Sequence, residues 1–231
     1  MNNTKLPFDL TFFELLTVIS TLSIGYLLIY KYTFYYYLGI PWFSTSLTPS
    51  YILFSSFGVM ILSIFGLLIA YALSSVFRTK KMMLSLYLLM VCICFLFVFY
   101  LKKSYPDIFK QFFSVILFVF YAITLFSLQN VYKLKMISSN STAAKTIHKK
   151  IILAMASTIS IFMYGAFPFY FGVQEAKNIM ENKSNLATIT NLKGSKEKWF
   201  LVEFMNDKVL LMKPNSEFKL VEYKDLETIT K

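Results

Sequence analysis

The sequence predicts a mainly α-helical membrane protein, in which a five-span transmembrane helix bundle is followed by a small C-terminal antiparallel β-module. Two observations carry this prediction. Of the 231 residues, 57% are hydrophobic and only 15% are charged, whereas about a quarter of the residues of a soluble domain are charged. The apolar residues also gather in long runs, and a run of about twenty matches the ~30 Å hydrocarbon thickness of a bilayer.

Five apolar runs are long enough to cross a bilayer, and together they make residues 1–173 a transmembrane helix bundle. We expect the spans at about residues 12–30, 51–77, 82–101, 108–128 and 151–173. A cleavable signal peptide is the alternative for the first run. Glu14 argues against it, because this carboxylate lies where the apolar part of a signal peptide should begin, and aromatic residues follow where a small-residue cleavage site should be.

The distribution of cations predicts the orientation, because short cytoplasmic loops carry an excess of Lys and Arg. With five crossings, the N-terminus and the loops at 78–81 and 129–150 share one face. That face carries Lys5, Arg78, Lys80, Lys81, Lys133, Lys135, Lys145, Lys149 and Lys150, against Lys31, Lys102, Lys103 and Lys110 on the other. We therefore expect a multi-pass protein of the cell membrane with a cytoplasmic N-terminus and an extracytoplasmic C-terminal module. The Lys-, Ile- and Asn-rich composition is typical of a bacterial source.

The net charge of +11 predicts a lipid partner. The cations gather at the ends of apolar spans, where they meet the anionic head groups of the cytoplasmic leaflet. Nucleic-acid binding requires cations clustered to neutralise phosphates, so we expect no nucleic-acid partner. The expected contacts with anionic lipid are Arg78, Lys80, Lys81, Lys149 and Lys150.

The chain becomes charged after the last apolar run. We expect 174–184 to be a linker or an extension of the fifth helix, and 185–231 to be a β-rich extramembrane module. Its short β-branched and aromatic runs are separated by "KGSKE", "ND" and "PNSE", which predicts a four-stranded antiparallel meander. Strict alternation would put Phe200, Val202 and Phe204 on one face. A module of this size buries little surface. We therefore expect it to pack against the membrane surface, nearby loops, or another copy or membrane partner.

An aromatic segment, "YKYTFYYYLGIPWFS", follows the first span. Tyr and Trp rings are stable at head-group depth, where the ring is apolar and the polar tip stays hydrated. Two interpretations stay open: an aromatic belt at the outer membrane interface, or a platform that holds a lipid, an apolar ligand or the β-module. The expected interfacial loop comprises Tyr35, Tyr36, Tyr37, Gly39, Pro41 and Trp42.

Groups that carry enzyme chemistry are scarce in this sequence. His148, the one histidine, lies in a basic stretch and is expected to be a solvated loop residue. Cys92 and Cys94 point about 200° apart on a helix, so they cannot share a metal ion and are expected to act as small apolar side chains. Glu14 fits a first-turn carboxylate that the helix dipole favours. We expect no enzymatic activity, no cofactor and no metal site.

The leading hypothesis is a non-enzymatic protein whose external β-module binds or senses a ligand or partner, or mediates oligomerisation. The helices would anchor the module and relay its state. Gly165 and Pro168 in "MYGAFPFYFG" are candidates for a hinge, since both should loosen or kink the fifth helix before the module.

The alternative is an oligomeric pore-forming or effector subunit of the defence, toxin or immunity type that permeabilises the membrane. A passive pore can be lined by Ser and Thr, and Thr17, Ser20, Thr21 and Ser23 form a polar stripe in the first span. Small residues at such spacing more often let helices pack closely.

Overall fold

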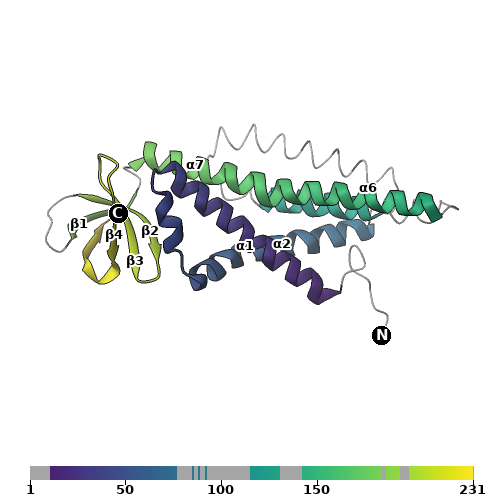
Figure 1. The fold of residues 1–231 in the computed structure, drawn as a ribbon, viewed down its shortest axis with the longest axis horizontal. Helices are drawn as coiled ribbons and strands as arrows, with labels where there is room; N and C mark the ends of the chain where they lie inside the picture. Colours follow the sequence, from purple (N-terminus) through teal and green to yellow (C-terminus); the bar gives the residue numbers. More distant parts are fainter. Residues whose placement is uncertain are drawn as a thin grey trace. The chain divides into compact units, whose positions relative to one another are not determined.

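A computed structural model describes residues 11–76, 85, 88, 92, 115–130, 142–183, 186–192 and 198–230 (Figure 1). Within these residues, three helical stretches are apolar and long enough to cross a bilayer: Phe13–Tyr37, Pro49–Ala72 and Thr146–Glu181. The helix Val115–Asn130 is apolar but shorter. The mainly helical fold is therefore confirmed, with long apolar helices of the membrane type.

The predicted count of five spans stays a prediction. The expected span at 82–101 lies outside the described residues except for three single positions, and the span at 108–128 is described from Val115 onward. Of the expected anionic-lipid contacts, Arg78, Lys80 and Lys81 also lie outside the described residues.

The helix that carries the expected fifth span is longer than that span. The helix expected to begin at Ile151 begins at Thr142, so His148 lies on a helix and not in a loop. Lys149 and Lys150 lie there too and are exposed. The segment "TAAKTIHKK" contains no Gly or Pro, and its Ala and Lys residues are good helix formers, so the chain continues as a helix beyond the apolar run.

Besides the helix Val115–Asn130, the described residues before the sheet form the following helical elements. They are α1 (Phe12–Tyr37), the 3₁₀-helix η2 (Pro41–Ser46), α2 (Pro49–Val76), α6 (Thr142–Ile161), the π-helical turn η4 (Phe162–Ala166) and α7 (Phe167–Glu181). Pro168 lies in the first turn of α7 and cannot donate the α-helical hydrogen bond to the carbonyl four residues earlier. The π turn therefore occurs where the sequence predicts an irregular helix.

The chain divides into two compact units. The first unit comprises Met1–Ser23 and Phe57–Tyr164, and the second unit comprises Ile24–Ser56 and Gly165–Lys231. Each of the three long helical stretches contributes to both units. The third of them changes unit between Tyr164 and Gly165, inside the π turn.

The second unit contains a five-stranded antiparallel sheet in the order β4-β3-β2-β1-β5. Its strands are β1 (Thr188–Leu192), β2 (Trp199–Met205), β3 (Lys208–Met212), β4 (Phe218–Glu222) and β5 (Leu226–Thr230). The C-terminal antiparallel sheet is confirmed, but the four-strand count is wrong. The last predicted strand is split by the 3₁₀ turn η6 (Tyr223–Asp225), and β5 pairs with the otherwise free edge of β1.

A β-bulge corrects the predicted alternation of β2. Leu201 pairs with Leu211 and Glu203 pairs with Leu210, so Val202 is an extra residue. A bulge shifts the side chains beyond it to the other face of the sheet. Glu203 therefore lies on the same face as Leu210, whereas Phe204 lies on the opposite face and is exposed.

The core of the second unit joins the aromatic segment to the sheet. Its buried members come from the end of α1 and its connection to α2, from α7, and from β2 and β3. They are Phe34, Tyr35, Leu38, Ile40, Phe43, Ala176, Ile179, Met205, Leu210 and Met212. In Figure 1 the connection between α1 and α2 lies next to β2. These direct contacts between the aromatic segment and the β-sheet favour the interpretation of the segment as a platform that holds the β-module.

Helix α7 approaches α1 closely at Gly172. A Cβ atom at this position would lie 2.6 Å from the carbonyl oxygen of Tyr30 and 3.1 Å from the backbone nitrogen of Phe34. Backbone atoms cannot move aside as the tip of a side chain can, so only glycine fits here. The contact holds α7 against the part of α1 that carries the aromatic segment.

The substitution Gly172→Ala is expected to destabilise the protein by about 1–3 kcal/mol, the usual penalty for forcing an extra methyl group into a packed contact. Thermal unfolding of the detergent-solubilised protein would measure it. Gly25→Ala is the matched control, since a Cβ atom there meets nothing within 4 Å and alanine favours the helix. Equal melting temperatures for the two variants would contradict the close approach.

Candidate functional site

The carboxylate of Glu203 is the meeting point of three donors from two helices. The Lys31 ammonium and the Tyr51 hydroxyl both donate to Oε1, and the Tyr35 hydroxyl donates to Oε2 at 2.8 Å. Lys31 and Tyr35 lie on α1, Tyr51 lies in the first turn of α2, and Glu203 lies on β2. We call these four residues the Glu203 cluster; all belong to the second unit.

Local geometry explains why these residues converge. Lys31 and Tyr35 are four residues apart and so share one face of α1. Gly39, with φ of +81°, and Pro41 at the start of η2 end the helix and turn the chain back, which brings the first turn of α2 alongside. On the sheet, the bulge at Val202 directs Glu203 to the face that meets these helices.

The ion pair of the Glu203 cluster is largely shielded from water. The side chains of Lys31 and Glu203 are 12% and 13% exposed. The Lys31 ammonium also lies between 5.5 and 5.9 Å from the centroids of four aromatic rings, a range in which a ring face attracts a cation. These rings belong to Tyr30, Phe34, Tyr35 and Tyr51. Burial of both charges is tolerated because each is neutralised and hydrogen-bonded.

Two further contacts tie the sheet to the helical segments. In the β2–β3 turn, the Asn206 side-chain amide donates to the Thr48 hydroxyl at 2.9 Å. Thr48 precedes α2, and its hydroxyl also accepts the backbone N–H of Tyr51 at 3.3 Å. Just beyond α7, Lys183 donates to the Pro214 carbonyl and to the Ser216 hydroxyl, both at 2.7 Å. The sheet is therefore held to the chain leaving α7 and to the residues around the start of α2, as well as through Glu203.

The predicted interfacial loop is partly helical, because Tyr35, Tyr36 and Tyr37 lie at the end of α1 and not in a loop. Its residues divide into buried and exposed ones. Tyr35 is fully buried in the Glu203 cluster, whereas Tyr36, Tyr37 and Trp42 are 58%, 42% and 53% exposed. Phe43, which the prediction did not single out, is also fully buried. One side of this stretch therefore packs against the sheet, and the other side is exposed.

Three members of the Glu203 cluster were not predicted as site residues. Lys31 carries a signal that was available: it is the only charged residue between Glu14 and Arg78. A lone cation among apolar residues implies a partner. Tyr51 and Glu203 carry no such local signal, because their roles depend on a turn and a bulge that bring distant segments together.

The first unit holds a separate set of polar contacts. The hydroxyls of Ser63 on α2 and Tyr164 in the π turn lie 2.9 Å apart. The hydroxyls of Tyr121, on the helix Val115–Asn130, and of Ser160, on α6, lie 2.7 Å apart. Gly66 packs against the backbone of Phe118, where a Cβ atom would lie 2.8 Å from the carbonyl oxygen. Small residues and hydroxyl pairs of this kind fix helix–helix contacts in membranes.

The hydroxyl groups of the polar stripe, which suggested a pore, form hydrogen bonds within α1. The hydroxyls of Thr17, Ser20 and Thr21 each donate to the carbonyl four residues earlier, as does that of Ser23. A helix accommodates hydroxyl groups in this way without lining a channel.

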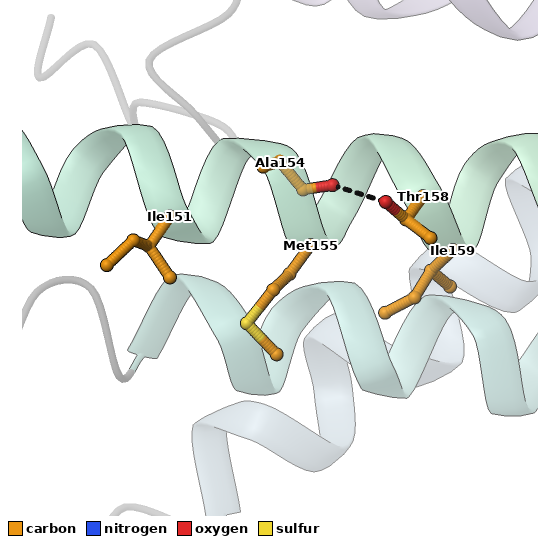
Figure 2. A pocket seen from close by; sticks show the side chains of 5 residues that line it. All are labelled: Ile151, Ala154, Met155, Thr158 and Ile159. Atoms are coloured by element: carbon orange, nitrogen blue, oxygen red, sulfur yellow. Dashed lines mark hydrogen bonds between the residues drawn. The ribbon is translucent and has the colours of Figure 1, made fainter.

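A shallow groove of about 430 Å³ runs along α6. Figure 2 shows its lining residues, Ile151, Ala154, Met155, Thr158 and Ile159, all on the same helix. The one side-chain hydroxyl, on Thr158, donates to the Ala154 carbonyl at 2.9 Å. None of these side chains is titratable, so the groove offers an apolar surface only. No cluster of metal-ligating side chains occurs among the residues that the structure describes.

Comparison of the chain with protein families, curated proteins and solved structures finds no match.

The Glu203 cluster predicts a large effect of Glu203→Gln. This change keeps the shape of the side chain but leaves the Lys31 charge without a counter-charge, and breaking a buried pair costs about 3–5 kcal/mol. Thermal unfolding of the full-length protein in detergent would measure the loss. Glu222→Gln is the control: Glu222 pairs with exposed Lys224, whose pKa it raises through a hydrogen bond and its charge. That exposed pair should contribute nothing measurable.

A second charge removal should restore most of the stability. In the double variant Lys31→Met with Glu203→Gln, no buried charge is left unpaired, so it should be more stable than Glu203→Gln alone. Thermal unfolding of Lys31→Met, Glu203→Gln and the double variant would measure the three losses of stability. If the loss in the double variant equals the sum of the losses in the two single variants, Lys31 and Glu203 do not depend on each other, and the ion pair is not what holds the sheet to α1.

Proposed function

We propose that this chain is a non-enzymatic, multi-pass protein of the cell membrane whose C-terminal sheet is a binding or sensing module coupled to the membrane helices. One observation carries the proposal: the carboxylate of Glu203, on an inner strand of the sheet, accepts hydrogen bonds from both α1 and α2. A force or a rearrangement on β2 therefore acts on two apolar helices at once.

The face of the sheet opposite Glu203 offers the contact surface for a ligand or partner. Phe204 and Tyr223 are 44% and 56% exposed there, with ring centroids 6.0 Å apart. The same face of the sheet carries a second core of Trp199, Val209, Leu211 and Val221. Exposed aromatic pairs over a packed core are common anchors of protein contacts.

The π turn before α7 is the element that we propose as the hinge. It contains Gly165, immediately precedes the turn with Pro168, and lies where the chain passes from the first unit to the second. Single π-helical turns inside α-helices occur frequently at functional sites. Movement of the sheet would reach the remainder of the third long helix through this turn.

Coupling between sheet and helices is tested by hydrogen exchange on the full-length protein in lipid nanodiscs. The variant Glu203→Gln should raise the exchange rates of β2 and also of the end of α1 and the start of α2. The Glu222→Gln variant should leave all three segments unchanged. Faster exchange confined to β2 would mean that the sheet is not coupled to the helices.

The orientation predicts which face of the membrane presents the module. Lys224→Cys, in the exposed turn η6, should react with an impermeant thiol reagent on intact cells in a background without Cys92 and Cys94. Lys149→Cys, exposed on α6, is the control and should react only after the cells are opened. Lys149 lies near the start of the stretch Thr146–Glu181, and the rest of that stretch, which is long enough to cross the membrane, separates it from Lys224.

Reversed labelling of the two cysteines would place the module in the cytoplasm and make its ligand an intracellular one. Asn206 is a poorer labelling site, although it lies in an exposed turn. Its φ of +50° favours asparagine, and its amide donates to Thr48.

A further inference from the structure

Exposed apolar and tyrosine side chains beside the Glu203 cluster form a stripe along one side of α1. Leu28, Ile29, Tyr32 and Tyr36 are 42%, 37%, 55% and 58% exposed. Residues three and four apart lie above one another on a helix, so these side chains share one surface. Along it the side chains change from aliphatic to tyrosine at Tyr32.

This change in side-chain type is what a membrane boundary selects. In the hydrocarbon layer aliphatic side chains are favoured, whereas tyrosine and tryptophan are favoured at head-group level, where ring and polar tip face different surroundings. Tyr37, at the end of α1, and Trp42, on η2, extend the exposed surface beyond Tyr36. Residues 32–50 contain no charged side chain.

The aromatic band also has a member on α7. Tyr170 is 51% exposed and lies two residues before Gly172. Gly172 contacts α1 at Tyr30, Thr33 and Phe34, so Tyr170 lies close to the level at which the stripe on α1 changes. Aromatic residues at one level on two neighbouring helices are typical of a belt facing lipid.

We propose that Tyr32, Tyr36, Tyr37 and Trp42 contact the lipid head-group layer, and that the hydrocarbon boundary crosses α1 at Tyr32. The inference rests on the proposed membrane location and adds the depth at which the second unit sits. Lys31 directly precedes Tyr32, so its ammonium lies at this boundary and turns away from lipid toward Glu203. The carboxylate of the sheet therefore neutralises a cation where water is scarce, and the sheet lies directly against the membrane surface.

The two tryptophans of the chain provide the test. Trp42 is 53% exposed and Trp199 is 4% exposed. In Trp199→Phe, reconstituted in phosphatidylcholine vesicles, Trp42 fluorescence should be quenched strongly by lipids brominated near the head-group end of the acyl chain and more weakly by lipids brominated near the methyl end. In the matched variant Trp42→Phe, the buried Trp199 should be quenched by neither lipid.

Two outcomes would overturn the inference. Quenching of Trp42 by aqueous acrylamide but by neither brominated lipid would mean that the residue faces water. Protection from all three quenchers would mean that a protein surface, such as a second copy of the chain, covers it. If Trp199→Phe does not fold, Tyr36→Trp in the Trp42→Phe background provides the same depth measurement against the constant signal of Trp199.

The depth measurement is independent of the binding role. A module that binds nothing, or that faces the cytoplasm, would still give the same quenching by the two lipids. Conversely, correct cysteine labelling with no lipid quenching would leave the proposed orientation in place and reject the aromatic contact with lipid.

Discussion

The Lys31–Glu203 ion pair is the interaction on which the second unit depends. It joins residues that are 172 positions apart in the chain, and it does so where both side chains are nearly shielded from water. Removal of either partner is destabilising, because the remaining charge is then buried without a counter-charge. The tyrosine hydroxyls of α1 and α2 then complete the hydrogen bonding of the carboxylate.

The sheet needs this attachment because it is too small to form an adequate core alone. Half of the buried members of its main core are supplied by the end of α1 and the connection to α2, and two more come from α7. The sheet adds only Met205, Leu210 and Met212 to that buried set. The helix ends and the sheet should therefore fold together and lose their structure together.

The local features of the fold were predictable, and the non-local ones were not. Apolar runs predicted the long helices, and turn residues predicted the antiparallel strands, because both signals act over a few residues. The bulge at Val202 could not be predicted, since the alternation in "WFLVEFM" is equally compatible with a regular strand. The pairing of β5 with β1 and of Glu203 with Lys31 likewise depends on which distant segments meet.

The ion pair also determines how α1 is rotated about its own axis. At about 100° per residue, Lys31 and Tyr35 define one side of the helix, and Tyr32 and Tyr36 follow on the adjacent side. Turning the first side toward Glu203 leaves the second side exposed, which matches the burial of Tyr35 and the exposure of Tyr36. The close approach of Gly172 on α7 to Tyr30 and Phe34 also holds this part of α1. The charge of Lys31 thus helps to select which aromatic residues of α1 meet the sheet and which stay exposed.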